Sequence, residues 1–295
     1  MTATIISGTE IAKQIRQELK QEVSQLKYKQ DLVPGLATIL VGGDPASQVY
    51  INAKVKTCEE LGIFSVKHAL PAEMNEPTLL ALIERLNKDH RVHGILVQLP
   101  LPEHIDESKV IMAIDPKKDV DSFHPVNVGK LMIGDPDYLP CTPQGIQQLL
   151  LRSGIEIEGA EVVIIGRSNI VGKPIANMLM QKKPGANATV TVCHTATRDI
   201  TAHTRRSDIL IVAAGKPKAI TADMVKEGVV VIDVGIHRIG KTAEGKSILC
   251  GDVDFDSVKE KAKAITPVPG GVGPMTIAML MTNTIKAAKL SAGLA

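Results

Sequence analysis

Short runs of aliphatic and β-branched residues alternate along the chain with longer segments in which apolar positions recur at helical spacing. The runs predict strands at residues 35–43, 64–70, 93–102, 161–166, 188–193, 208–215 and 229–235. Apolar residues are nearly continuous within most runs, which is typical of strands that are covered on both faces. Because strand and helix signals alternate, the pattern predicts βαβ units, parallel sheets and therefore an α/β protein.

The intervening segments predict the helices and the loops. Helices are expected at residues 46–61, 76–88, 107–113, 142–152, 221–227 and 275–290, with another that begins near Val171. Ahead of the first run, the N-terminus predicts a short strand followed by an amphipathic helix. The stretch DPKKDVDSFHPVNVGKL (115–131) predicts a loop, and TPVPGGVGP (266–274) is too rich in Pro and Gly for a helix or strand.

The alternating pattern restarts near residues 140–150 and ends near 265–275, which indicates two domains. A length of 295 residues is also natural for two domains of ordinary size. We expect one domain at residues 1–141, completed by residues 268–295 at the C-terminus, and a second domain at residues 142–267.

Composition excludes several classes of protein. The net charge of +2 is spread without a basic block, and three Phe, three Tyr and no Trp offer no stacking platform, so we expect no nucleic-acid partner. The four cysteines form no C-x-x-C pair, which favours free thiols over a disulfide framework or a zinc knuckle. The N-terminus lacks a signal peptide and no apolar run approaches about 18 residues, so we expect a cytoplasmic protein without a membrane partner.

The stretch EVVIIGRSNIVGKPIANMLM (161–180) carries the clearest functional signal. A buried strand runs into Gly166, then a turn of small and polar residues, and then a helix start. Such a turn directs backbone N–H groups and the positive end of the helix at a phosphate. The regular G-x-G-x-x-G spacing fails, because Ser168 and Val171 stand where glycines are expected. A dinucleotide site and a plain tight turn both fit the turn taken alone.

The end of the next predicted strand bears on the choice of cofactor. NAD-binding folds usually place an acidic residue there to hold the ribose 2′-hydroxyl. Here the strand ends in VTVC and continues His-Thr-Ala-Thr-Arg (194–198), while Arg167 lies in the glycine turn. A missing acid and a nearby Arg suit a 2′-phosphate, so we expect NADP rather than NAD. The predicted strands that end at 213–215 and 233–235 would place their carboxyl ends at the edge of the sheet where ligands bind. Ile236 could contact the cofactor there through its backbone.

Candidate chemistry in the first half is less distinctive. Tyr50 and Lys54 are four residues apart near a helix start and share one face, as plain surface pairs also do. Gln98 closes an apolar strand, either as a pocket residue or as a polar strand end. The acidic residues at 115, 119 and 121 lack the glycine and terminal glutamate of a calcium loop, so we interpret them as exposed loop carboxylates and predict no metal.

Taken together, these motifs make the chain resemble the methylenetetrahydrofolate dehydrogenase/cyclohydrolase family along nearly its whole length. The matching stretches are VYINAKVKTCEELGI, GILVQLPLP, KKDVDSFHPVNVGKL, PCTPQGI, IIGRSNIVGKPIANML, VTVCHTAT, VVVIDVGI, GDVDF and TPVPGGVGPMTIAML. The resemblance implies an N-terminal α/β catalytic, folate-binding domain and a Rossmann-type NADP-binding domain, with the active-site cleft between them. It also implies a homodimer, one-carbon tetrahydrofolate derivatives as substrates, and a place in one-carbon metabolism that supplies purine biosynthesis.

The family's activity is oxidation of 5,10-methylenetetrahydrofolate to the methenyl form, followed by hydrolysis to 10-formyltetrahydrofolate. Carried over by motif, the resemblance makes Lys54 the central catalytic group, with Tyr50 beside it, Gln98 tuning it and Asp121 holding the pterin ring. The remaining implied folate contacts are Val97, Leu99, Pro267, Pro269, Gly270 and Gly271, and the implied NADP contacts are Gly166, Arg167, Ser168, Thr195 and Ile236. The hydrolytic step suits a lysine whose pKa is lowered by burial.

The sequence departs from the family pattern at two places, and three alternative functions remain. The family's DVDG is DVDS here, so Ser122 replaces a glycine and the path of the loop is in question. The stretch QKKPGANATV is slightly long and predicts a longer surface loop. A dehydrogenase without cyclohydrolase activity, a shikimate-type NADP oxidoreductase and a non-catalytic NADP-binding protein are the alternatives. The presence of Lys54 and Gln98 speaks against the first, and that of Lys54 against the last. The Pro-Gly loop and the Tyr50–Lys54 segment speak against the second.

Overall fold

The computed structural model describes residues 2–241, 245 and 247–294, and the chain divides into two compact units. One unit comprises Met1–Lys13 and Thr142–Thr276, and the other comprises Gln14–Cys141 and Ile277–Ala295. Two long helices, α1 (Gly8–Gln30) and α10 (Val272–Ser291), each contribute residues to both units. None of the helices within the described residues is long and apolar enough to cross a membrane.

The first unit is built on a six-stranded parallel sheet with the order β1-β11-β8-β7-β5-β6. Its strands are β1 (Thr4–Ile5), β5 (Glu161–Ile165), β6 (Thr189–Cys193), β7 (Ile209–Val212), β8 (Val230–Asp233) and β11 (Ala264–Ile265). The central strands β5, β7 and β8 are buried almost throughout, as the continuous apolar runs predict. An antiparallel hairpin of β9 (His237–Lys241) and β10 (Ser247–Cys250) follows β8.

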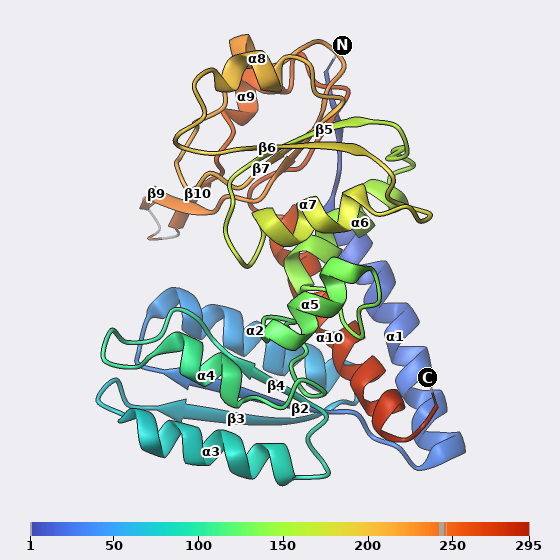
Figure 1. Cartoon of the computed structure of the whole chain (residues 1–295), viewed down its shortest axis with the longest axis vertical. Helices are drawn as coiled ribbons and strands as arrows, with labels where there is room; N and C mark the ends of the chain where they lie inside the picture. Colours follow the sequence, from blue (N-terminus) through green and yellow to red (C-terminus); the bar gives the residue numbers. More distant parts are fainter. Residues whose placement is uncertain (1, 242–244, 246, 295) are drawn as a thin grey trace. The chain divides into compact units, whose positions relative to one another are not determined.

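Helices cover both faces of this sheet (Figure 1). The helices of this unit are α6 (Cys141–Arg152), α7 (Gly172–Met180), α8 (Ile200–Thr204), α9 (Phe255–Val258) and the 3₁₀ turn η1 (Ala222–Met224). In Figure 1, α6 and α7 lie on one face, whereas α8 and α9 lie on the other. The strand order reverses at β5, since β6 lies on one side of it and β7 on the other. This is a doubly wound arrangement, in which ligands bind beyond the carboxyl ends of the strands.

The second unit has a three-stranded parallel sheet with the order β3-β2-β4. Its strands are β2 (Gly35–Val41), β3 (Phe64–Leu70) and β4 (Gly94–Val97), and its helices are α2 (Pro45–Leu61), α3 (Glu76–Lys88), α4 (Glu107–Ala113) and α5 (Pro125–Ile133). One core joins alternate residues of β2 and β4 to the apolar face of α3, where Leu79 and Ile83 are fully buried. The prediction of an α/β protein with parallel sheets is therefore confirmed.

Several local predictions need correction. The strand expected at 93–102 ends at Val97, and the cis Leu99–Pro100 bond turns the chain soon afterwards. The helix expected at 221–227 is only the turn η1. The stretch 115–131, expected to be a loop, contains the start of α5, which His124 caps and Pro125 opens.

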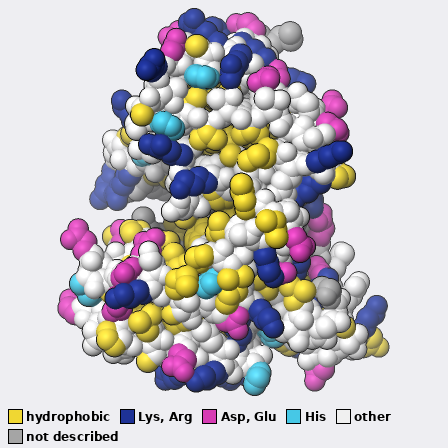
Figure 2. Space-filling view, viewed as in Figure 1, with side chains coloured by type: hydrophobic (Ala, Val, Ile, Leu, Met, Phe, Trp, Pro, Cys, Tyr) yellow, Lys and Arg dark blue, Asp and Glu magenta, His cyan; other side chains and the backbone are white. Residues whose placement is uncertain are grey.

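Residues 1–13, which the sequence pattern places with the N-terminal domain, cluster in the structure with Thr142–Thr276. The reason is the pairing of β1 with β11, a contact between segments about 260 residues apart that no local pattern reveals. Positive and negative side chains are interspersed on the drawn face of each unit (Figure 2), so a field of one sign does not dominate that face.

Candidate functional site

Lys54 and Gln98 meet inside the unit that carries β2, β3 and β4. Asp44 caps helix α2 by accepting from the Ser47 N–H at 2.8 Å, and this helix places Lys54 in a buried position. The Lys54 Nζ donates to the Gln98 Oε1 at 2.9 Å. Gln98 follows β4 directly, and its Nε2 donates to the Leu99 carbonyl oxygen at 2.9 Å. The amide oxygen is thereby oriented toward the lysine, so Gln98 makes a specific contact with Lys54 beyond the end of the strand.

Asp121 and Cys141 complete this cluster. Burial lowers the pKa of Lys54, while the charge of Asp121 opposes that shift. Burial also raises the pKa of Asp121 and raises that of Cys141 well above its usual range. The Cys141 thiol has one hydrogen to share between the Asp121 carboxylate and the Val120 carbonyl oxygen, which lies 3.4 Å away. A lysine in such a place releases its proton more readily than an exposed lysine does.

Cys141 was not among the residues proposed from sequence. It stands in the stretch PCTPQGI, where a lone cysteine is most simply a small buried residue. Tyr50 lies one turn before Lys54 on α2, is half-buried, and has a pKa that burial raises. Val97 is buried and Leu99 is half-buried at the end of β4.

The acidic residues at 115, 119 and 121 have different surroundings, which separates their roles. Asp119 is only 3% exposed and accepts from the His124 N–H at 2.8 Å, the Phe123 N–H at 3.2 Å and the Asn127 Nδ2 at 2.8 Å. Asp115 accepts from the Lys117 N–H at 2.9 Å. The interpretation of the three residues as exposed carboxylates is therefore wrong, because Asp119 is the buried centre of the loop and Asp115 and Asp121 are half-buried. Within the described residues, no group of three His, Cys, Asp or Glu side chains could hold a metal ion.

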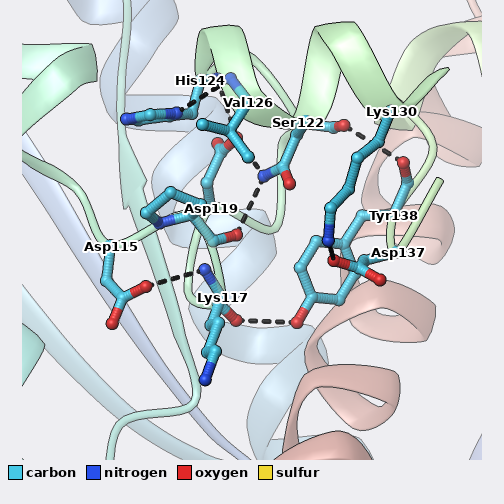
Figure 3. Close-up of polar contacts among 11 residues, drawn as sticks. Asp115, Lys117, Asp119, Ser122, His124, Val126, Lys130, Asp137 and Tyr138 are labelled. Carbon is cyan, nitrogen blue, oxygen red and sulfur yellow. Dashed lines mark hydrogen bonds and ion pairs between the residues drawn. The ribbon is translucent and has the colours of Figure 1, made fainter. Parts of the chain in front are cut away.

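The loop around Asp119 is closed by its own polar contacts (Figure 3). The Tyr138 hydroxyl donates to the Lys117 carbonyl oxygen at 2.7 Å, and Lys130 pairs with Asp137. Ser122 has a φ of 61°, and its hydroxyl donates to the Tyr138 carbonyl oxygen at 3.1 Å. The backbone therefore takes the left-handed conformation that a glycine favours, and a buried hydrogen bond offsets its cost for serine.

The candidate nucleotide turn lies at the carboxyl end of β5 in the six-stranded unit. Gly166 has a φ of 118°, and a Cβ there would lie 2.2 Å from the Ala213 carbonyl oxygen. A Cβ on Gly172 would lie 2.2 Å from the Gly166 carbonyl oxygen. The Ser168 hydroxyl accepts from the Val171 N–H at 3.1 Å, while Arg167 is exposed. Glycine is thus required at two points where the backbone folds closely, and the turn fits the approach of a phosphate to the start of α7.

The carboxyl end of β6 adjoins this turn, since the Gly166 N–H donates to the Cys193 carbonyl oxygen at 2.8 Å. Thr195 follows as an exposed residue, and the His194 N–H donates to the Thr197 hydroxyl at 2.9 Å. Hydroxyl groups and backbone, rather than a carboxylate, therefore form the end of this strand.

Two buried aspartates that the sequence did not single out fix the backbone beside Ile236. Asp233 accepts from the N–H groups of Gly235 (3.0 Å), Asp252 (2.9 Å) and Val253 (3.0 Å). Burial raises the pKa of Asp233 to about 6, against the effect of these backbone donors. Asp252 in turn accepts from the Gly215 N–H at 2.9 Å and contacts the His237 Nε2 at 2.6 Å. The strand ends at 213–215 and 233–237 are therefore cross-linked, and Ile236, which is 42% exposed, lies between them.

The Pro-Gly loop packs closely on the start of α1 in the same unit. The Thr9 N–H donates to the Gly270 carbonyl oxygen at 3.0 Å, and a Cβ on Gly8 would lie 1.8 Å from the Gly271 carbonyl oxygen. Pro269 follows a cis peptide bond, and Pro267 is half-buried. Just beyond the loop, the hydroxyls of Thr142 and Thr276 lie 2.9 Å apart.

Comparison with known proteins assigns both parts of the chain to domains of one family. Residues 6–121 match the family model for the catalytic domain of tetrahydrofolate dehydrogenase/cyclohydrolase, and residues 140–292 match the model for its NAD(P)-binding domain. The Bifunctional protein FolD of Syntrophus aciditrophicus is 69% identical over 294 residues, which cover 100% of each chain.

Two solved structures agree with this result. The bifunctional FolD methylenetetrahydrofolate dehydrogenase/cyclohydrolase of Campylobacter jejuni is 51% identical with a TM-score of 0.91, covering 98% of this chain and 99% of that one. The Trypanosoma brucei dehydrogenase-cyclohydrolase, solved with NADP cofactor and an inhibitor, is 41% identical with a TM-score of 0.94, covering 99% of each chain.

Proposed function

The chain belongs to the tetrahydrofolate dehydrogenase/cyclohydrolase family, and we propose that it converts 5,10-methylenetetrahydrofolate to 10-formyltetrahydrofolate in two steps. The first step oxidises the methylene carbon to the methenyl form, and NADP, when bound, supplies the acceptor for the hydride. The second step adds water to the methenyl carbon, opens the ring and releases one proton. The observation that carries the proposal is the buried contact of 2.9 Å between Lys54 Nζ and Gln98 Oε1, with Asp121 near by.

We assign the proton movement in the second step to Lys54. In its neutral form the amine takes a proton from the attacking water, and the lowered pKa keeps a larger fraction of the amine neutral. Gln98 accepts a hydrogen bond from Nζ and so directs the remaining hydrogens and the lone pair. Tyr50, on the same helix, lines the substrate pocket beside Lys54.

We assign substrate binding to Asp121 and to the Pro-Gly loop. The Asp121 carboxylate can accept from the N–H groups of the pterin ring, whereas Asp119 has its oxygens directed at the loop's own donors. Val97 and Leu99 offer apolar contact surface next to Gln98. The loop residues Pro267, Pro269, Gly270 and Gly271 are proposed to border the folate. In this division of labour, we propose that residues 1–141 with 268–295 act as the catalytic domain and residues 142–267 as the nucleotide domain, although residues 1–13 and 268–276 cluster with the six-stranded unit.

We propose that the cofactor is held at Gly166, Arg167, Ser168, Thr195 and Ile236. The close backbone packing at Gly166 and Gly172 supports this, since a side chain at either position would clash with backbone and displace the turn that directs N–H groups at a phosphate. Exposed Arg167 and the absence of an acid at residues 194–198, directly after β6, support a 2′-phosphate, and hence NADP.

An absorbance assay on one purified sample tests the proposal. Methylenetetrahydrofolate is supplied with NADP or with NAD, and hydrolysis of methenyltetrahydrofolate is followed separately. Rapid NADP reduction, slow NAD reduction and loss of the methenyl absorbance are expected. Reduction without hydrolysis would identify a dehydrogenase alone, and NADP binding without either reaction would identify a binding protein.

We also propose a homodimer that forms through the six-stranded unit. β6 is an edge strand of the sheet, and Val192 on this strand is 37% exposed. Ile170 (44% exposed) and Met180 (51% exposed) are further exposed apolar residues of the same unit. An apolar edge strand left uncovered favours pairing with a second chain. Light scattering during size-exclusion chromatography should give twice the mass of the chain, and Val192→Lys should give the monomer.

The setting is proposed to be the cytoplasm, in one-carbon metabolism that supplies purine biosynthesis. Cys58, Cys141, Cys193 and Cys250 are all free thiols, which suits a reducing compartment. Cell fractionation with an antibody against the chain checks the location.

A further inference from the structure

Asn283 is a buried polar residue on α10 that joins two separate stretches of the chain. Its Nδ2 donates to the carbonyl oxygens of Val120 and Leu139, each at 2.8 Å, and lies 3.7 Å from the Cys141 Sγ. The residue is 2% exposed. Because an amide nitrogen carries two hydrogens, these two carbonyls use its full donor capacity.

The neighbouring residues on α10 show that this arrangement is unusual for the helix. Met279, Leu280 and Met281 are buried apolar residues, and buried Thr284 donates to the Leu280 carbonyl oxygen of its own helix at 2.8 Å. Asparagine is a poor helix former, and burying its amide is costly unless partners are provided. Its partners lie 163 and 144 residues away, so Asn283 links α10 to other parts of the unit.

The two carbonyls stand one and two residues before groups that surround Lys54. Val120 precedes Asp121, and Leu139 is two residues before Cys141. The Asp121 carboxylate and the Cys141 thiol form a hydrogen bond with each other. Both groups lie close enough to Lys54 to interact with it electrostatically. One side chain therefore fixes the backbone that presents two of the three groups around Lys54, the third being Gln98.

We propose that Asn283 is a positioning residue of the active site, which holds Val120 and Leu139 so that Asp121 and Cys141 face Lys54. This inference rests on the proposed function. The intervening loop has its own contacts, from the Ser122 hydroxyl to the Tyr138 carbonyl and from the Tyr138 hydroxyl to the Lys117 carbonyl. We expect these contacts to survive the replacement of Asn283, so that its main effect is a displacement of Asp121 and Cys141.

Asn283→Leu is the informative variant, because leucine has a similar size and no donor. Misplacing a binding group should raise the KM for methylenetetrahydrofolate about tenfold, while the KM for NADP changes less than about twofold. The negative charge of Asp121 raises the pKa of Lys54, and Gln98 stays in place. Displacement of Asp121 should therefore move the rising limb of the hydrolysis pH profile to lower pH.

A second measurement does not depend on activity. Iodoacetamide labelling followed by mass spectrometry gives the alkylation rate of each cysteine, with buried Cys58 as an internal reference. Asn283→Leu should speed the alkylation of Cys141 and leave that of Cys58 unchanged. Thr284→Val is the matched control, since it removes a buried hydroxyl from the adjacent position without touching Val120 or Leu139.

The outcomes separate the possibilities. A folate KM, a pH profile and a Cys141 alkylation rate equal to those of Thr284→Val would overturn the inference and leave Asn283 a structural residue. If the leucine variant does not fold, Asn283→Ser replaces it, because one hydroxyl donor should give an intermediate effect on all three readouts. If the wild type catalyses neither reaction, the proposed function fails, and the alkylation rates alone decide whether Asn283 holds Cys141.

Discussion

The two units carry their candidate site residues in different ways. In the unit with the three-stranded sheet, the chemistry lies in side chains, since Lys54, Gln98 and Asp121 are brought together from a helix, a strand end and a loop. In the six-stranded unit, the candidate nucleotide site lies in backbone, at turns where Gly166 and Gly172 allow close folding. Aspartates serve the two designs differently, because buried Asp233 has its acceptors directed at backbone N–H groups whereas half-buried Asp121 interacts with Lys54 and Cys141.

The difference determines what a substitution can reveal. Removing a side chain from the first site should change the chemistry and leave cofactor binding intact. Adding a side chain to the second site should block the cofactor and leave hydrolysis intact, because water addition needs no hydride acceptor. The two reactions therefore report separately on the two units.

The largest effect is expected for Lys54→Met. Methionine fills the buried space without a proton to give or accept, so hydrolysis of methenyltetrahydrofolate should fall at least about 10³-fold. NADP affinity, measured by calorimetry, should be unchanged. Lys56→Met, at an exposed position on the same helix, is the control. Normal hydrolysis in the Lys54 variant would remove Lys54 from the mechanism.

The same lysine gives the hydrolysis reaction of the wild type its pH dependence. The neutral amine is the active form, and burial lowers its pKa below the usual 10.5. The rate should therefore rise with pH and reach its half-maximal value below pH 10.5, which stopped-flow absorbance can measure. In Lys54→Met the residual rate should not show this rise with pH.

Gly166→Ala should have the next largest effect, on the other unit. The new Cβ would meet the Ala213 carbonyl oxygen at 2.2 Å, and the φ of 118° is unfavourable for alanine. The turn must move, so the Kd for NADP should rise at least about tenfold. Hydrolysis should change less than about twofold.

Gly228→Ala is the matched control for the glycine turn. Its φ of 79° is also positive and favours glycine, but nothing lies within 4 Å of the added Cβ. It should lower the melting temperature without changing the Kd for NADP. If both variants weaken NADP binding equally, backbone strain and not the closeness of the turn explains the loss.

Arg167→Ser should produce a smaller and more selective change. Arg167 is exposed in the turn, and we expect it to pair with the 2′-phosphate of NADP. The KM for NADP should rise about tenfold while the KM for NAD stays the same. NAD is the matched control ligand, since it differs by that phosphate alone. An equal loss for both cofactors would place Arg167 elsewhere on the dinucleotide.

The sequence predicted the elements whose signals are local. The apolar runs at 35–43 and 161–166 correspond to β2 and β5, because continuous burial leaves a continuous pattern. Helix α5 was missed because the polar loop before it concealed the capping residue His124 and the opening Pro125. The pairing of β1 with β11 had no local signal, since it depends on where the two segments meet in space.

Prediction of the candidate site from the sequence has the same limit. Lys54 and Gln98 could be proposed from motifs, and the structure brings them into contact. Asp252 and Cys141 could not, because their importance comes from partners distant in sequence, such as Gly215 for Asp252. The role of Asp119 was misjudged for the same reason, since its N–H donors belong to a loop whose fold the pattern did not reveal.

The smallest effect is expected at Ser122, where the side-chain site also depends on backbone conformation. Ser122→Gly relieves the strain of a φ of 61° and loses the hydrogen bond to the Tyr138 carbonyl, two effects of about 1 kcal/mol each and of opposite sign. The free energy of unfolding, from urea denaturation, should thus change by less than about 1 kcal/mol. Ser122→Ala keeps the strain and loses the bond, so it should be less stable than Ser122→Gly by about 1 kcal/mol. If the glycine variant is as unstable as the alanine variant, the hydrogen bond dominates, and this loop is held by side chains even at its most strained residue.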